Sequence, residues 1–328
     1  MDSHAAKAVV APLSRLWDCD VETAQAAFAE VLAPDAVVHL AYPFETLEGP
    51  ADLNARAIAA LYAAMPDIER RDWIVMAAPD AHGEMWVGMG GHYIGTFVAP
   101  FLDIPPTGRT ATIRYHEFYR IEGGRAVEMQ ALWDIPELMM QADVWPKAPS
   151  LGREWTVPGP ASQDGLRIEG DGSHALKVVG DMLAALKRNN EGVEAMELPR
   201  YWHPRCTWYG PSGIGTGRGI RGFREHHQIP FLDAMPDRRA FAGRAHFFGE
   251  GDYVGFTAWP GMAMTLTGGG WIGLPGTGAE LTMRSLDFWR VEGDLIRENW
   301  VLVDILDVYK QLGVNVFDRM RALPQWRG

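Results

Sequence analysis

Cysteine and basic residues are scarce in this sequence. Cys19 and Cys206 are the two cysteines among 328 residues, and they form neither a zinc-ligand spacing nor a disulfide framework. Lys and Arg number 30 against 42 Asp and Glu, which gives a formal charge of −12 at pH 7. Because a nucleic-acid partner requires clustered positive charge to neutralise its phosphates, we expect no nucleic acid to bind.

Long apolar runs and familiar catalytic signatures are also missing. No stretch approaches the roughly 18 apolar residues of a membrane helix, and the residues before Val21 lack the pattern of a signal peptide. We therefore expect a soluble, cytoplasmic chain that binds no membrane. There is no P-loop lysine, HExxH, GxSxG or paired-cysteine motif. Residues 217–222 match GxGxxG without a surrounding βαβ unit, so they are expected to be a loop entering a helix. No metal or other cofactor is expected.

The sequence does contain an internal repeat. Equivalent residues lie 170 positions apart, as Gly49 and Gly219 do. The tetrapeptide Ala-Met-Pro-Asp occurs at 64–67 and 234–237, Glu-Gly at 122–123 and 292–293, and Asp-Ile at 134–135 and 304–305. The period is too long for a solenoid and indicates tandem duplication of a domain. We predict a first domain at 1–144, a linker rich in proline and glycine at 145–171, and a second domain at 172–328.

Each half is predicted to consist of helices followed by a mostly antiparallel meander. The predicted helices are Val21–Leu32, Gly49–Met65 and Pro136–Ala142 in the first half, and Ser173–Asn190, Ile220–Met235 and Ile305–Leu312 in the second. The predicted strands are Ala36–Ala41, Ile68–Ala78, Glu84–Val98, Arg109–Ile121 and Arg125–Asp134, then Arg205–Tyr209, Arg238–Phe248, Tyr253–Leu266, Ala279–Val291 and Leu295–Asp304. Because helices and strands do not alternate, the pattern favours an α+β fold, and a strongly curved sheet wrapped by helices would leave a blind pocket.

Several motifs resemble those of the SnoaL-like polyketide cyclase (ester cyclase) family. In the second half they are residues 218–222, 235–237, 274–278 and 287–293, and the segment 298–304 followed by Gln-Leu-Gly at 311–313. The first half shows the same order at 47–49, 65–67, 105–108 and 117–120. The resemblance implies two tandem NTF2-like cone domains, each a curved sheet wrapped by helices around a pocket. It also suggests a cofactor-independent cyclase, lyase or isomerase.

The strand that ends at Asp304 carries the leading catalytic candidate. At a period of two, Trp300, Leu302 and Asp304 share one face. The resemblance implies that Asp304 is the acid–base residue, and a carboxylate desolvated by these neighbours would have a raised pKa. Asp304 could also cap the helix that begins at Ile305, and the two roles could coexist. Asp134 is its counterpart in the first half.

The neighbouring strand supplies five further candidates: Arg114, His116 and Glu117 in the first half, and Arg284 and Asp287 in the second. Arg114 and His116 share one face and Glu117 lies on the other, but the sequence does not say which face looks inward. His116 could share a proton relay with Asp134 or be an ordinary surface or core residue.

Arg284 also has more than one possible role. It could bind an enolate oxygen, or it could pair with Asp287 or Glu298.

Substrate-binding candidates lie on three other strands as well. His39 and its counterpart Tyr209 could each donate a hydrogen bond to a substrate carbonyl. His92 and Trp259 on the long strand could line the pocket, together with Trp300. Arg114 completes this set. We expect the partner of these residues to be a small molecule.

These observations favour acid–base chemistry on a small, largely hydrophobic carbonyl compound. The expected reactions are aldol-type cyclisation or its reverse, isomerisation and dehydration. A non-catalytic binding or interaction module is the alternative, because one fold hosts many functions. One half could also be catalytic and the other structural. The duplication suggests either a monomeric pseudo-dimer or a homodimer.

Overall fold

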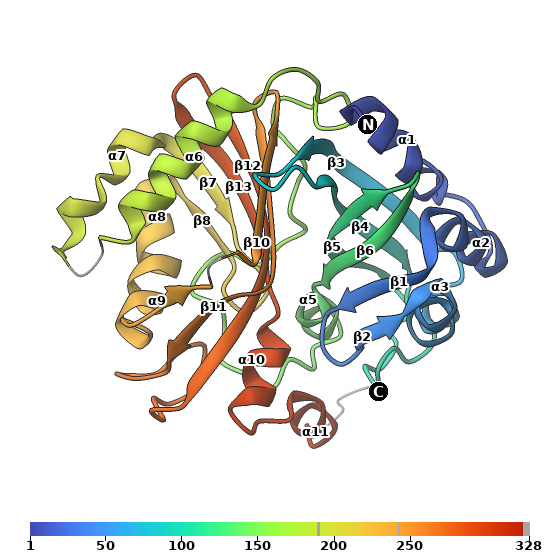
Figure 1. Ribbon diagram of the computed structural model, residues 1–328. Helices are drawn as coiled ribbons and strands as arrows, with labels where there is room; N and C mark the ends of the chain where they lie inside the picture. Colours follow the sequence, from blue (N-terminus) through green and yellow to red (C-terminus); the bar gives the residue numbers. More distant parts are fainter. Residues whose placement is uncertain (189–190, 242, 324–328) are drawn as a thin grey trace.

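Two β-sheets pack face to face in the middle of the molecule, and most of the helices cover their outer sides (Figure 1). The computed structural model describes residues 1–188, 191–241 and 243–323. Within these residues no helix is both long enough and apolar enough to cross a membrane. Each sheet belongs to one half of the chain, and both halves have the predicted α+β cone architecture.

The first half contains the elements expected from the repeat, with additional short ones. Its elements are α1 (Ser3–Val10), η1 (Leu13–Arg15), α2 (Val21–Val31), β1 (Leu32–Leu40), β2 (Glu45–Glu48), α3 (Gly49–Leu53), η2 (Asn54–Ile58), α4 (Ala59–Ala64), β3 (Glu69–Pro79), β4 (Met85–Thr96), β5 (Thr110–Glu122), β6 (Arg125–Trp133) and α5 (Ile135–Gln141). The predicted helix from Gly49 is divided by one π-helical turn, η2. Helix α2 begins where the Asp20 carboxylate accepts a hydrogen bond from the Thr23 amide.

The second half repeats this order after the connecting segment. Its elements are α6 (Ser173–Leu186), η4 (Val193–Met196), α7 (Leu198–Tyr201), β7 (Trp202–Tyr209), β8 (Thr216–Arg218), α8 (Gly219–Phe223), η5 (Arg224–Gln228), α9 (Ile229–Ala234), β9 (Arg239–Ala240), β10 (Ala245–Glu250), β11 (Tyr253–Thr265), β12 (Glu280–Glu292), β13 (Leu295–Val303), α10 (Ile305–Gln311) and α11 (Val316–Arg321). The predicted strand 238–248 is split into β9 and β10. Asn189 and Asn190, at the end of a predicted helix, and Ala242, within the predicted strand, lie outside the described residues.

The two sheets have equivalent strand orders, β2-β1-β6-β5-β4-β3 and β10-β11-β12-β13-β7-β8, with β9 added beside β11. One neighbouring pair in each sheet is parallel, β1 with β6 and β7 with β13, and the other pairs are antiparallel. In β5, Tyr115, Glu117 and Tyr119 point into the first cone, toward its helices. Because side chains alternate along a strand, His116 and Phe118 point toward the other sheet.

We call the interface between the two sheets the seam. Its buried core comprises Trp86, Phe118, Leu132, Phe248, Phe288, Trp300 and Leu302, which come from both halves. Phe118 and Phe288 stack across it with ring centroids 4.9 Å apart. A Cβ at Gly88 would lie 2.8 Å from the Phe288 ring, so this glycine permits the close approach of the sheets.

The connecting segment 145–171 is packed along the seam. Val157 and Ile168 are buried in it, and the carbonyl of Gly165 accepts a 2.8 Å hydrogen bond from the Val75 amide. On the other sheet, the Trp300 indole donates to the carbonyl of Pro158 at 2.9 Å. The segment therefore contacts both halves along its length.

Candidate functional site

The predicted site residues fall into two groups. Glu117 and Asp287 point into the cones. The other ten lie along the seam: Asp134, Asp304, Arg114, Arg284, His116, His39, His92, Tyr209, Trp259 and Trp300. The face that carries Asp304 and Trp300 thus looks toward the other half of the chain and away from its own cone.

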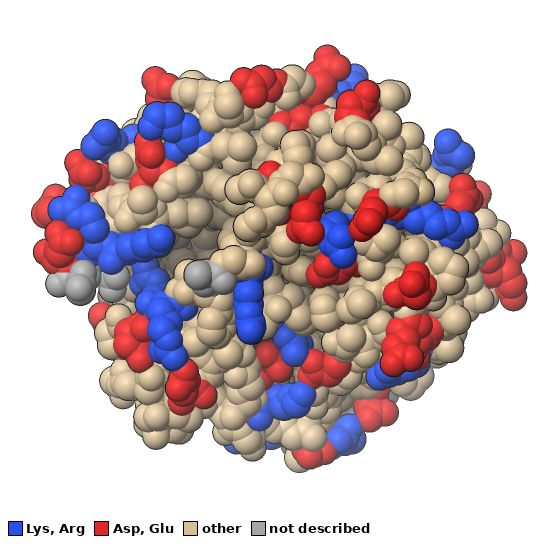
Figure 2. All heavy atoms as spheres, in the orientation of Figure 1, with Lys and Arg blue, Asp and Glu red and all other residues tan. Residues whose placement is uncertain are grey.

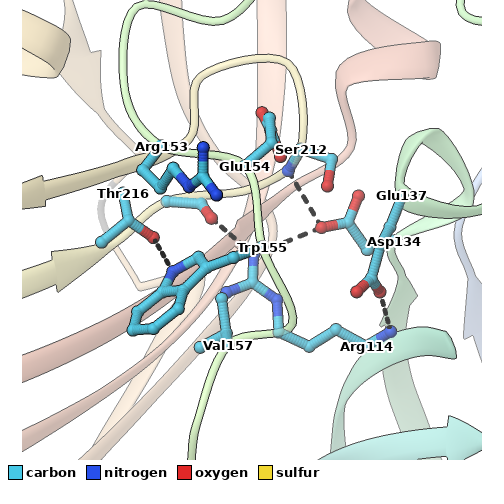
Figure 3. A pocket seen from close by; sticks show the side chains of 10 residues that line it. Arg114, Asp134, Glu137, Arg153, Glu154, Trp155, Val157, Ser212 and Thr216 are labelled. Carbon is cyan, nitrogen blue, oxygen red and sulfur yellow. Dashed lines mark hydrogen bonds and ion pairs between the residues drawn. The ribbon is translucent and has the colours of Figure 1, made fainter. Parts of the chain in front are cut away.

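The two aspartates that follow β6 and β13 occupy matching positions at the seam. Asp304 Oδ2 accepts a hydrogen bond from the Tyr42 amide at 3.0 Å and pairs with Arg284 at 3.0 Å. Asp134 Oδ2 accepts from the Ser212 amide at 2.9 Å and pairs with Arg114 at 3.3 Å (Figure 3). Each aspartate therefore receives an arginine from its own half and a backbone amide from the other half.

Two very small cavities adjoin the aspartates. A cavity of about 10 Å³ lies between Asp134 and Asp304, and another of about 10 Å³ is bounded by Arg114, Asp134, Glu137 and Glu154 (Figure 3). A volume of this size holds about one water molecule. A cavity of this size does not admit a carbonyl substrate.

Burial nevertheless perturbs the carboxyl groups in this region. It raises the pKa of Asp304 to about 6, although the Arg284 guanidinium opposes the shift. Burial, and then the neighbouring Asp134, raise the pKa of Glu137 to about 8. Asp304 Oδ1 also accepts a hydrogen bond from the Asp307 amide at 3.2 Å, so it caps α10 as well.

The seam histidines and Arg284 are held by protein groups. His116 Nδ1 lies 2.7 Å from the carbonyl of Leu286, across the seam, and burial lowers its pKa well below the usual range. Its Nε2 has no hydrogen-bond partner among the described residues, so no hydrogen bond carries the suggested relay to Asp134. Burial lowers the pKa of His92 to about 3. Within the described chain, Arg284 pairs with Asp304, with Asp307 and, at 2.6 Å, with Glu45, rather than with Asp287 or Glu298.

The predicted binding residues of the seam mainly contact one another. His39 stacks on Trp259 with centroids 5.6 Å apart, and the Arg284 guanidinium lies 4.7 Å from the Trp259 ring centroid. Tyr209 stacks on Trp300 at 5.3 Å and donates a 3.2 Å hydrogen bond to Glu298. The His39–Trp259 stack joins the two halves, whereas the contacts of Arg284 and Tyr209 lie within the second half.

Glu117 is surrounded by donors inside the first cone. Its carboxylate accepts hydrogen bonds from Arg70 at 2.8 Å, Tyr93 at 3.0 Å, Tyr119 at 2.7 Å and the Trp133 indole at 3.0 Å. The Glu117 residue is 0% exposed. A buried carboxylate with a full set of donors stabilises the cone and has no acceptor position left for a ligand.

Asp287 occupies the equivalent position in the second cone, but its surroundings differ. Among the described residues, no group hydrogen-bonds to its buried Oδ1. The residue as a whole is only partly buried, and burial of the carboxyl raises its pKa well above the usual range. A carboxylate without partners, in a partly accessible interior, is the arrangement expected of a group that meets a ligand.

The repeat explains why the second cone is less filled. Tyr115 faces Trp133 across β5 and β6, whereas the equivalent pair in β12 and β13 is Ser285 and Val303. Arg70, which neutralises Glu117, corresponds to Ala240 at the same 170-residue offset. The surface is hollowed between the helices and strands of the second half (Figure 2).

Other polar atoms in the second half also lack partners in the described structure. The Trp289 indole nitrogen and His227 Nδ1 are buried without a hydrogen bond. His227 stacks on Trp208 with centroids 4.1 Å apart, and burial lowers its pKa to about 3, which keeps it neutral. Sequence reasoning alone does not single out Trp289 or His227. The replacement of Tyr115 and Trp133 by Ser285 and Val303 at equivalent positions is visible in the sequence, and it is the signal that distinguishes the second cone from the first.

Comparison with known proteins identifies the family of this chain. The model of the SnoaL-like polyketide cyclase family matches residues 13–142 and 179–312, which together are most of the chain. The chain belongs to this family. Both matches agree with the two tandem copies inferred from the repeat. A search of curated proteins gave no significant match.

Solved structures give matches to one copy at a time. IdmH of Streptomyces antibioticus is 21% identical with a TM-score of 0.35, covering 42% of this chain and 96% of its own. TsrD of Streptomyces laurentii is 18% identical with a TM-score of 0.36, covering 43% and 97%. An NTF2-like protein of Burkholderia xenovorans is 14% identical with a TM-score of 0.34, covering 43% and 97%. Each of these chains is therefore about as long as one half of the present protein.

Proposed function

We propose that this SnoaL-like protein transfers a proton at a carbon next to the carbonyl of a small, largely hydrophobic compound bound in the second cone. Asp287 is the acid–base residue. The observation that carries the proposal is the contrast between two equivalent carboxylates. Glu117 accepts four hydrogen bonds from protein groups, whereas Oδ1 of Asp287 accepts none from the described residues.

The surroundings of Asp287 suit this chemistry. A raised pKa brings a carboxyl group closer to the pH at which it can both accept and return a proton. In an aldol cyclisation, Asp287 would remove the proton from carbon, the resulting enolate would attack a second carbonyl, and the alkoxide would regain a proton. The unpaired Trp289 indole N–H is available to stabilise the enolate oxygen. Isomerisation or dehydration would use the same proton transfers.

Division of labour between the halves is part of the proposal. The first cone is filled by Tyr115, Trp133 and the donors around Glu117, so it serves as a scaffold. Asp304 is the second catalytic candidate, because its pKa of about 6 would also permit proton transfer. The space beside it would have to widen beyond that of one water molecule before a substrate could enter.

Proton exchange at carbon tests the proposal even though the natural substrate is unidentified. Aromatic 1,3-diketones are incubated with the protein in D₂O, and deuterium incorporation beside the carbonyl is followed by NMR. We expect the wild type to accelerate exchange and D287N to lose about 10²–10⁴-fold of that acceleration. E117Q, the matched change in the first cone, should retain it. Loss in D304N but not in D287N would place the chemistry at the seam, and specific binding without exchange would favour a binding module.

A further inference from the structure

Three side chains with metal-binding atoms meet at one edge of the seam. Asp80 and Glu84 belong to the β3–β4 connection of the first half, and His246 belongs to β10 of the second. His246 Nδ1 lies 2.8 Å from Asp80 Oδ2 and 3.5 Å from Glu84 Oε2. Their ligand atoms all lie within 4.8 Å of one another, and no other group of three in the described chain meets this condition.

The surrounding structure holds these groups in place. Asp80 Oδ1 accepts hydrogen bonds from the amides of His82 at 2.8 Å and Glu84 at 3.0 Å, which leaves Oδ2 directed at His246. The Asp80 side chain is 1% exposed. The His246 ring packs on the Trp86 indole with centroids 4.4 Å apart. Two of the three groups are thus fixed before any ligand arrives.

We propose that Asp80, Glu84 and His246 bind a divalent cation, with Zn²⁺ as the preferred ion, and that this ion joins the two halves. Zn²⁺ takes histidine nitrogen and carboxylate oxygen at about 2.0–2.2 Å in tetrahedral geometry, so neighbouring ligand atoms lie roughly 3.3–3.6 Å apart. One separation from His246 already lies in this range and the other is shorter, and all three ligand atoms lie within 4.8 Å of one another. The mixed nitrogen and oxygen set also suits Zn²⁺ better than Mg²⁺ or Ca²⁺.

The remaining coordination position faces the surface. His82 is exposed on the same connection, with its ring centroid 6.4 Å from that of His246, so either its imidazole or water can supply a fourth ligand. The ion would bind the Nδ1 lone pair of His246 and the carboxylate oxygens of Asp80 and Glu84, so protons compete with the metal for these atoms. Metal affinity should therefore fall as the pH is lowered. This site lies apart from the cone interior and is independent of the proposed catalysis.

Direct metal titration tests the site. Protein treated with EDTA and then dialysed is titrated with ZnCl₂ by calorimetry, and with CoCl₂ while the visible absorption of tetrahedral Co²⁺ is recorded. We expect one ion per chain, and an affinity reduced by about 100-fold or more in H246Q and by about 10–100-fold in E84Q. E84Q is the safer variant for folding, because the Glu84 side chain is 39% exposed and its loss leaves Asp80 and His246 paired.

A matched histidine provides the control. His174 lies 3.4 Å from Asp294 on the surface, an imidazole–carboxylate pair without a third ligand in the described chain, so H174Q should bind Zn²⁺ as the wild type does. The proposal is wrong if the wild type binds no Zn²⁺ at micromolar concentration, or if E84Q and H246Q bind it unchanged. Equal losses in H174Q and H246Q would show nonspecific binding to surface histidines and would also overturn it.

Discussion

The same chemical change at the two equivalent carboxylates is expected to have opposite effects on stability. In E117Q the buried Arg70 guanidinium loses its closest carboxylate partner and keeps only Asp72, at 3.0 Å, among the described residues. Breaking a buried ion pair from one side costs about 3–5 kcal/mol, and the remaining contact with Asp72 places the expected loss at the lower end, about 3 kcal/mol. For a cooperative unit as large as one half of this chain, that corresponds to a Tm lower by about 6–12 °C.

In D287N the expected change in stability has the opposite sign. The folded-state pKa of Asp287 is raised by burial, so ionising this group opposes folding. Its contribution to stability is present below the pKa of the unfolded chain and is lost as the pH rises toward the folded-state pKa. Each pH unit between the two pKa values corresponds to about 1.4 kcal/mol. The asparagine variant should therefore be more stable than the wild type at pH 7, and the difference should vanish below about pH 4.

Differential scanning calorimetry at pH 7 and pH 4 measures both effects. The wild type, E117Q and D287N are compared at each pH, and circular dichroism establishes that the variants are folded. The reasoning fails if D287N is destabilised at pH 7 as much as E117Q. It also fails if D287N gains the same stability at both pH values, because the gain would then be unrelated to ionisation.

Two further predictions concern the seam. F288A should lower the free energy of unfolding by about 3–5 kcal/mol, because it removes a fully buried ring that stacks on Phe118. Chemical denaturation at pH 7 should show this loss. A cost below about 1 kcal/mol would mean that the packing of the sheets does not depend on this contact. The folded-state pKa of Asp304 is about 6 against an ordinary 3.8, so raising the pH from 4 to 7 should reduce its contribution by up to about 3 kcal/mol, at about 1.4 kcal/mol for each pH unit between the two values. D304N lacks this titration, so its stability relative to the wild type should rise over that interval in denaturation curves recorded at both pH values, and a constant difference would contradict the burial of this carboxyl group.

The repeat and the hydrophobic periodicity were sufficient to predict two α+β copies, whereas the NTF2-like cone architecture was implied by the family resemblance. Constant spacing between equivalent residues identified two copies, and the alternation within β5 and β13 correctly grouped residues that share a face. These signals depend on local sequence, so they can be recognised before the tertiary structure is determined. The family match and the two sheets confirm that part of the prediction.

The orientation of the faces could not be predicted in the same way. Strands in this protein are covered on one side by helices and on the other by the second sheet, so both faces contain buried residues. Alternation shows that Trp300 and Asp304 lie together, but it cannot distinguish the seam from the cone. The candidate metal group was equally hidden, because its ligands come from opposite halves and have no short-range spacing. Asp287 stands out only when its lack of partners is compared with the contacts of Glu117.

Joining the halves in one polypeptide has a consequence for how the protein can change. In a homodimer, any mutation appears in both subunits, so enlarging one binding chamber also hollows out its twin. Here Val303 stands opposite Ser285 while Trp133 still fills the corresponding space beside Tyr115. One lobe can therefore accumulate variation that suits new substrates, while the other keeps the robust packing on which both depend.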